Sequence, residues 1–329
     1  RQLILKNWKA GSMTTCVRAD RLAASTRIQW VPQPELSAAH AAYVVATRAK
    51  CNDEKTEQLL VQPVTEVNNR LLASAVDVGQ FWQQYLLQIM SDVPMENACG
   101  FALLSAGANE MQVDQTTKAI VHRLGDARLA FMSRYPKLAE QLDLRARPLS
   151  ERWETYGPGL LNQVGKQIWG DSTPDEWWMP QVTALTVQPL RGGDGGCDPV
   201  NSRLWLEAML TDVDPRVPEV LRIAWLLTSM AIDTYARETS GDLRLMLPWS
   251  LVSVPLVLQA GRELELVRGE ALPVSEAMEL WHFADAGVAA TVSQWWSDQR
   301  DSTAPMPARL KTLDQMLPER SRKINAEDL

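Results

Sequence analysis

Two distant segments of the chain share one residue pattern, and such a repeat limits the possible folds more than any bulk property does. Residues 59–76 read LLVQPVTEVNNRLLASAV, and residues 185–209 read LTVQPLRGGDGGCDPVNSRLWLEAM. Both contain Leu-x-Val-Gln-Pro followed by an apolar residue and, after a loop, Val-Asn-x-Arg-Leu. The pattern predicts an internal duplication. Further matches follow in the same order: YLLQIM (85–90) with WLLTSM (225–230), and IVHRLGDA (120–127) with LWHFADA (280–286).

Helical signals dominate the chain, so the expected fold class is mainly α, or α+β at most. A stretch that is apolar on most sides predicts a central buried helix from residue 218. The clearest strand candidates are residues 183–190 and 59–64, each of them short and ended by a proline. Copies of one fold often pack about a twofold axis. We therefore expect two internally duplicated, helix-rich halves with a few short strands in a pseudo-twofold arrangement. Other helices are predicted by alanine content or helical spacing over residues 34–50, 76–90, 116–132, 245–261 and 275–296.

The repeat also sets the expected domain boundaries. The Gly-Ser-Met sequence at residues 11–13 is typical of a cloning scar, and whether residues 1–12 are native is left open. The expected units are a vector-derived or leader segment (1–17), a first repeat (18–144), a second repeat (145–300) with a glycine-rich loop at 191–198, and a C-terminal tail (301–329).

Charge and hydropathy exclude several classes of partner. Residues 1–150 carry a formal charge of +3 and residues 151–329 one of −10, which gives the net charge of −7. A basic footprint for nucleic acid is therefore absent, and no nucleic-acid partner is expected. The most apolar run, 245–261, is shorter than the ~20 residues of a spanning helix and holds two prolines, so no membrane role is expected.

Cysteine and histidine usage predicts no metal site and no cofactor. The four cysteines are scattered without a CxxC pair, and the chain has three histidines. Scattered cysteines and the lack of a visible signal peptide suit a reducing cytoplasm. His122 and His282, on apolar faces of predicted helices, are interpreted as core residues rather than ligands.

The glycine-rich loop is the candidate ligand site. It joins a predicted strand to a helix expected to begin at Pro199, with Asp198 as its N-cap. Glycines let a ligand approach the backbone, and a strand, glycine loop and helix N-terminus together bind anions. The acidic residues of the loop oppose a phosphate, however, and no nucleotide-binding fingerprint is matched. A flexible surface loop, a ligand or catalytic loop and a partner-binding loop all stay open. The candidate ligand-binding residues are Gly192, Gly193, Gly195, Gly196 and Asn201.

The candidate catalytic residues are Asp194, Arg203 and Glu207, because paired carboxylates can perform acid–base chemistry or hold a hard cation. For Asn201 and Arg203 we expect a structural role at the start of the helix after the loop, so the catalytic role of Arg203 and the ligand-binding role of Asn201 are the alternatives. Because the first repeat lacks the glycines, the loop is expected to be dispensable for folding.

Thirteen tryptophans include two adjacent pairs, Trp177–Trp178 and Trp295–Trp296. Neighbours on a helix cannot face the same core. Core packing is the default interpretation of these four tryptophans. Otherwise some indole surface is exposed, or is covered by the C-terminal tail or by a partner, and the four are therefore candidate partner-binding residues.

The leading functional hypothesis is that the chain is a soluble, cytoplasmic and non-catalytic interaction or scaffold protein. It is expected to bind a protein partner and is also a possible homo-oligomer. The alternative is an enzyme or small-ligand binder with a single site at the glycine-rich loop.

Overall fold

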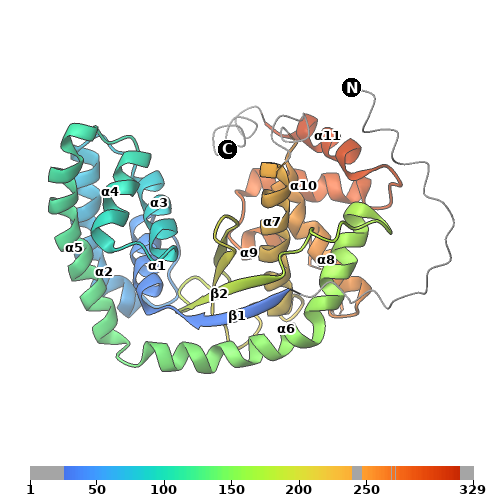
Figure 1. The fold of residues 1–329 in the computed structure, drawn as a ribbon, viewed down its shortest axis with the longest axis horizontal. Coiled ribbons are helices and arrows are strands. Elements are labelled where there is room, and N and C mark those ends of the chain that lie inside the picture. Colours follow the sequence, from blue (N-terminus) through green and yellow to red (C-terminus); the bar gives the residue numbers. More distant parts are fainter. Residues whose placement is uncertain (1–25, 239–246, 268, 271, 319–329) are drawn as a thin grey trace.

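The fold is mainly helical, as predicted, with one small sheet between two groups of helices (Figure 1). The structure is a computed structural model that describes residues 26–238, 247–267, 269–270 and 272–318, so the predicted leader at 1–17 lies outside it. In Figure 1 the helices α1–α5 form an N-terminal lobe on the left, and α7–α11 form a C-terminal lobe on the right. The sheet lies between the lobes, and the long helix α6 runs beneath it and then rises on the right within the C-terminal lobe.

The sheet has four strands in the order β1-β2-β4-β3. Its first three strands are parallel, with β2 paired to both β1 and β4, whereas β3 runs antiparallel to β4. The predicted strand at 183–190 is confirmed as β2, which ends before Pro189. The strands are β1 (Arg27–Pro32), β2 (Gln181–Val187), β3 (Gly195–Asp198) and β4 (Arg203–Glu207).

Alternate residues of the central strands β2 and β4 enter two different apolar cores. Along β2, Val182 and Ala184 belong to the core of the C-terminal lobe, whereas Leu185 and Val187 belong to the core of the N-terminal lobe. Trp205 of β4 faces the N-terminal lobe in the same way. Successive strand side chains point to opposite faces, so the sheet is a shared wall between the two cores.

The N-terminal lobe contains the helices that were predicted over 34–50, 76–90 and 116–132. Pro34 occupies the first turn of α1, where its missing N–H costs nothing. Asp53 and Asp77 cap α2 and α3 by accepting hydrogen bonds from backbone N–H groups of the first turns. The helices are α1 (Pro34–Ala46), α2 (Glu54–Ala73), α3 (Val78–Met90), α4 (Met95–Ser105), the 3-10 helix η1 (Glu110–Gln112) and α5 (Val113–Arg134).

The C-terminal lobe is built around α7, and the predicted central buried helix is confirmed because residues 220–232 are buried throughout. The single helix predicted over 275–296 is instead two, since the chain turns at His282 with a φ of 53° and Asp285 caps a new helix. The helices are α6 (Leu138–Trp169), α7 (Glu219–Glu238), η3 (Trp249–Val252), α8 (Ser253–Glu263), α9 (Val274–Leu280), α10 (Ala286–Gln299) and α11 (Met306–Met316).

The two similar sequence blocks adopt different secondary structures, which overturns the predicted duplication and its pseudo-twofold arrangement. Residues 59–73 belong to helix α2, whereas 185–209 contain the end of β2, a loop, β3 and β4. The strand predicted at 59–64 is therefore wrong. The buried positions of α2 recur at helical spacing, and this packing outweighs the one hydrogen bond that Pro63 removes.

Two predicted boundaries also fail. The boundary between residues 144 and 145 falls inside α6, whose Leu142 lies in the N-terminal core and whose Leu149 lies in the C-terminal core. The predicted tail contains α11, and its Leu310 and Leu313 are fully buried.

Candidate functional site

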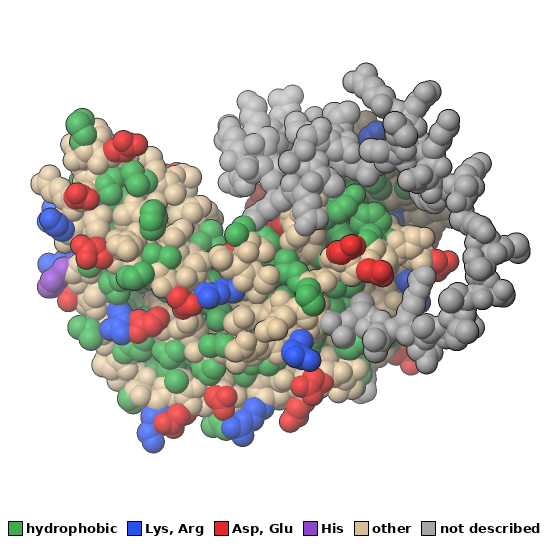
Figure 2. Space-filling model, viewed as in Figure 1, with side chains coloured by type: hydrophobic (Ala, Val, Ile, Leu, Met, Phe, Trp, Pro, Cys, Tyr) green, Lys and Arg blue, Asp and Glu red, His purple; other side chains and the backbone are tan. Residues whose placement is uncertain are grey.

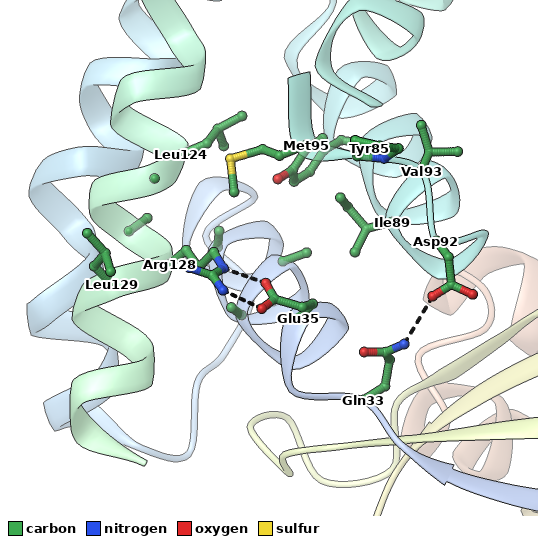
Figure 3. Close-up of a pocket in the computed structure, with 16 residues that line it drawn as sticks. Gln33, Glu35, Tyr85, Ile89, Asp92, Val93, Met95, Leu124, Arg128 and Leu129 are labelled. Carbon is green, nitrogen blue, oxygen red and sulfur yellow. Dashed lines mark hydrogen bonds and ion pairs between the residues drawn. The ribbon is translucent and has the colours of Figure 1, made fainter. Parts of the chain in front are cut away.

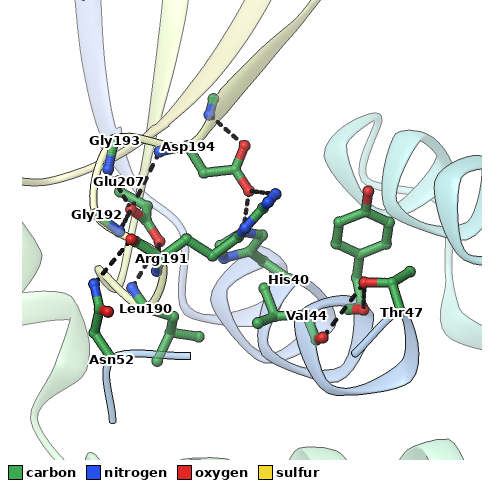
Figure 4. A network of polar contacts seen from close by, with 12 residues as sticks. His40, Val44, Thr47, Asn52, Leu190, Arg191, Gly192, Gly193, Asp194 and Glu207 are labelled. Atoms are coloured by element: carbon green, nitrogen blue, oxygen red, sulfur yellow. Dashed lines mark hydrogen bonds and ion pairs between the residues drawn. The ribbon is translucent and has the colours of Figure 1, made fainter. Parts of the chain in front are cut away.

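The glycine-rich loop closes around a carboxylate of this chain. Glu207 ends β4, beside the C-terminal end of β2 from which the loop departs, and its side chain is fully buried. Five consecutive backbone N–H groups, those of residues 190–194, donate to the two carboxylate oxygens of Glu207 at 2.6–3.2 Å (Figure 4). Such a concave row of N–H groups is an anion-binding nest. In this protein the anion is a side chain of the next strand.

Asp194 continues the network into the N-terminal lobe. Its Oδ2 lies 3.1 Å from Nε2 of the fully buried His40 on α1, and it accepts a hydrogen bond of 2.8 Å from Arg191 (Figure 4). Its Oδ1 accepts from the N–H of Gly195. Burial alone would raise the pKa of Asp194, but the hydrogen bond from His40 and the charges of His40 and Arg191 outweigh burial and lower the pKa to about 2.

Arg222 ties the same loop to the central helix of the C-terminal lobe. Its guanidinium is fully buried and donates to the carbonyl oxygens of Asp194 and Glu207 at 2.6 Å each. It also forms a buried ion pair with Glu219, one helical turn earlier on α7. Asn52, in the link between α1 and α2, hydrogen-bonds the loop at Leu190 O and Arg191 O. The loop therefore joins both lobes at one end of the sheet.

The predicted ligand-binding glycines are ordered, and their donors have an internal acceptor. Gly192 and Gly193 have φ values of 82° and 109°, which favour glycine, and their N–H groups bind Glu207. A Cβ on Gly193 would lie 3.0 Å from the carbonyl oxygen of Leu280. Gly195 and Gly196 lie in β3. Because residues 191–197 supply four of the five donors for Glu207 and most of β3, the structure gives no support to the expectation that the loop is dispensable.

The three candidate catalytic residues are only partly brought together. Asp194 and Glu207 meet in the loop, but both are buried and engaged with partners. Arg203 points elsewhere, to Met90 O and to Asp92 of the N-terminal lobe, at 2.7 Å each.

Residues 199–202 form a turn between two strands, so the helix predicted from Pro199 is wrong. Asp198 accepts hydrogen bonds from the N–H groups of Val200 and Asn201, which mimics a helix cap. Asn201 hydrogen-bonds Asp198 through its side chain and lies at the surface of this turn. Asn201 therefore has a turn-forming contact instead of the helix-capping role that was expected of it.

All four candidate partner-binding tryptophans are buried, with exposed fractions of 0–8%, which agrees with the core-packing interpretation and leaves little indole surface for a partner. Trp177 and Trp178 precede β2 and pack against each other, and Trp177 also packs with Trp169 and Tyr235. The α10 pair, Trp295 and Trp296, is covered by α11, because the guanidinium of Arg309 lies over both indole rings.

The histidines differ from their interpretation. His122 is not a core residue, since its side chain is 76% exposed beside Asp126. His282 is also exposed, in the turn after α9, and partial desolvation there lowers its pKa. Among the described residues, no group of three or more His, Cys, Asp and Glu side chains is placed to hold a metal ion.

A pocket in the N-terminal lobe escaped the sequence analysis. It has a volume of about 530 Å³ and lies between α1, α3, the start of α4 and α5. Ala38, Ala39 and Ala42 of α1 line this pocket, and their short side chains leave its volume unfilled. Figure 3 shows Tyr85, Ile89, Met95 and Leu124 around this space, with the Glu35–Arg128 ion pair at its base. The alanine-rich sequence of α1 was the available signal.

No known family model matches this chain, and neither a curated protein nor a solved structure is significantly similar to it. Within the described ranges, no helix combines the length and apolar character that a membrane span requires.

The buried Asp194 predicts an acid-dependent loss of stability. Because its folded pKa of about 2 lies below the ordinary value of 3.8, its ionised form stabilises the protein above pH 3.8, and this contribution is lost as the pH falls toward 2. Urea unfolding of wild type and Asp194→Asn at pH 7, 5 and 3 measures this contribution to the free energy of unfolding. We expect the variant to be less stable at pH 7 and to lose less stability between pH 5 and 3. Parallel losses in the two proteins would contradict this role.

Proposed function

We propose that this chain is a non-catalytic protein-interaction module whose N-terminal lobe receives an amphipathic helix of a partner protein. The observation that carries the proposal is the open, largely apolar pocket between α1, α3 and α5 (Figure 3). Amphipathic helices commonly bind in such grooves by inserting apolar side chains at helical spacing.

The chemistry of the groove supports an apolar occupant. Its base is an ion pair in which Arg128 binds both carboxylate oxygens of Glu35, so the two charges neutralise each other. The alanines of α1 offer no long side chain to keep a partner backbone away. Leu129, on the α5 side, is 63% exposed and would be covered by a bound helix.

The surface of the N-terminal lobe carries apolar side chains that lie among acidic and basic groups (Figure 2). Scattered residues of this kind are normal on a protein surface, whereas contiguous apolar surface marks interaction sites, so the pocket and not these residues carries the proposal. Large apolar side chains that are at least one-third exposed on α2–α5 and η1 are Leu59, Val61, Leu72, Leu87, Phe101, Leu104, Met111 and Leu129.

The alternative, a ligand or catalytic site at the glycine-rich loop, has less support. An external anion would have to displace the Glu207 carboxylate from five N–H donors. His40, Asp194 and Glu207 are also at least nine-tenths buried, so a substrate has no direct access to them.

A library of helical peptides displayed against the purified protein tests the proposal. We expect the selected peptides to carry apolar residues at i, i+3 or i+4, and i+7, and to lose affinity when a charge is placed at the groove. Leu129→Glu should weaken their binding about tenfold or more, which corresponds to about 1.4 kcal/mol.

Leu72→Glu is the matched control, because Leu72 is 65% exposed on α2 and does not line the groove. It should leave the affinity within about twofold of wild type. Selected peptides without helical apolar spacing, or peptides that bind the Leu129→Glu variant as tightly as wild type, would overturn the proposal.

A further inference from the structure

A second pocket, in the C-terminal lobe, gathers three arginines. It has a volume of about 410 Å³ and is lined by residues of α6, α8, α10 and α11 and of the link between the last two helices. Arg262 lies in the last turn of α8, Arg300 follows α10, and Arg309 lies on α11. The pocket lies apart from the groove of the N-terminal lobe and shares no residue with it.

Arg309 is a buried guanidinium without an anionic partner in the described part of the chain. The residue is only 6% exposed, and its Nε and Nη2 atoms are buried without a hydrogen-bond acceptor. The guanidinium instead lies 5.7 Å from the ring of Trp295 and 5.2 Å from that of Trp296. Burial lowers the pKa of Arg309. A buried cation of this kind is costly unless an anion approaches it.

The other two arginines have weak partners. Arg262 makes one long hydrogen bond of 3.5 Å to Leu272 O, and burial and the charge of Arg300 lower its pKa. Arg300 contacts Asp301 at 3.5 Å, in a pair whose side chains are 51% and 90% exposed. Exposed pairs of this kind contribute little.

The carboxylates at the pocket do not reach the buried cation. Glu263 accepts a hydrogen bond from Gln259, and Asp301 contacts Arg300 at the surface. With three cations and two carboxylates, the lining of the pocket has a net positive charge. Gln167 contributes a further buried atom, Oε1, without a donor among the described residues.

We propose that this pocket binds the phosphate group of a small phosphorylated compound, held by Arg309 together with Arg262 and Arg300. The planar guanidinium fork matches a tetrahedral oxyanion and supplies charge-assisted hydrogen bonds. The pocket has room for more than the phosphate itself, and the free Oε1 of Gln167 suits a hydroxyl donor of the ligand.

Isothermal titration of the full chain with inorganic phosphate and with glycerol 3-phosphate, at matched ionic strength, tests the proposal. We expect both probes to bind wild type, and tighter binding of glycerol 3-phosphate would identify a phosphomonoester rather than the free ion as the ligand. Arg300→Gln, at the exposed mouth of the pocket, should weaken binding about tenfold or more. Arg309→Lys keeps the charge but loses the fork, and it should weaken binding as well.

Arg147→Gln is the matched control, because Arg147 is 66% exposed on α6 and pairs with Asp143 away from the pocket. Circular dichroism and the melting temperature establish whether each variant is folded. If Arg309→Lys does not fold, the test relies on Arg300→Gln. Absence of binding to folded wild type, or equal binding by wild type, Arg300→Gln and Arg147→Gln, would overturn the proposal.

Discussion

Glu207→Gln should destabilise the folded protein by about 3–5 kcal/mol, the range observed when one partner of a buried charged contact is removed. The substitution keeps the size of the side chain, so no cavity contributes. One carboxylate oxygen becomes an NH₂ group that faces backbone N–H donors, and these donors lose their acceptor. Urea unfolding at pH 7 measures the change in the free energy of unfolding.

Hydrogen exchange gives a second readout for the same variant, since the amide protons of residues 190–194 should exchange faster when their acceptor is gone. Glu154→Gln is the control, because Glu154 is an exposed residue of α6. A Glu207→Gln protein within about 0.5 kcal/mol of wild type would show that the loop does not depend on this carboxylate.

Arg222→Met is expected to have an effect of similar size, about 3–5 kcal/mol. It leaves the carboxylate of Glu219, which is 3% exposed, without its cation, and it removes the donors from the carbonyl oxygens of Asp194 and Glu207. The free energy of unfolding in urea is again the measurement.

A double-mutant cycle separates these two causes. In Arg222→Met/Glu219→Leu neither charge is buried alone, so the double variant should be more stable than the sum of the two single effects by about 0.5–3 kcal/mol. Strict additivity would mean that the loss of the carbonyl contacts, and not the unpaired Glu219, dominates the effect of Arg222→Met.

The helices were predictable where local sequence and tertiary packing agree. The alanine-rich α1 and the apolar α7 are recognisable because their spacing and composition match their environments. Local signals misled where packing overrides them. Pro63 reads as the end of a strand but lies inside α2, and the Asp198–Pro199 pair resembles a helix start although residues 203–207 form β4. The strand is stabilised by its pairing with β2, which a local pattern cannot contain.

The sequence predicted which residues belong to the candidate site but not how they contact one another. Asp194 and Glu207 were identified, yet the acceptor for the loop lies 13 residues beyond its last donor, and only the pairing of β2 with β4 brings them together. Arg222 and Glu219 carried a usable signal, since opposite charges one turn apart in an apolar helix indicate an internal pair. Cover of the α10 tryptophans by the C-terminal segment was among the interpretations of the sequence, but the segment was expected to be a tail and not the helix α11.

The shared sheet gives adjacent residues of one strand unrelated neighbours. A change of size at Ala184 has to be accommodated by the helices of the C-terminal lobe, whereas a change at Leu185, the next residue, has to be accommodated by those of the N-terminal lobe. Covariation along β2 should therefore alternate, with even positions tracking one set of partners and odd positions the other. For the same reason neither half of the chain carries a complete interior of its own: separating the lobes would leave one apolar face of the sheet in water, whichever half kept it.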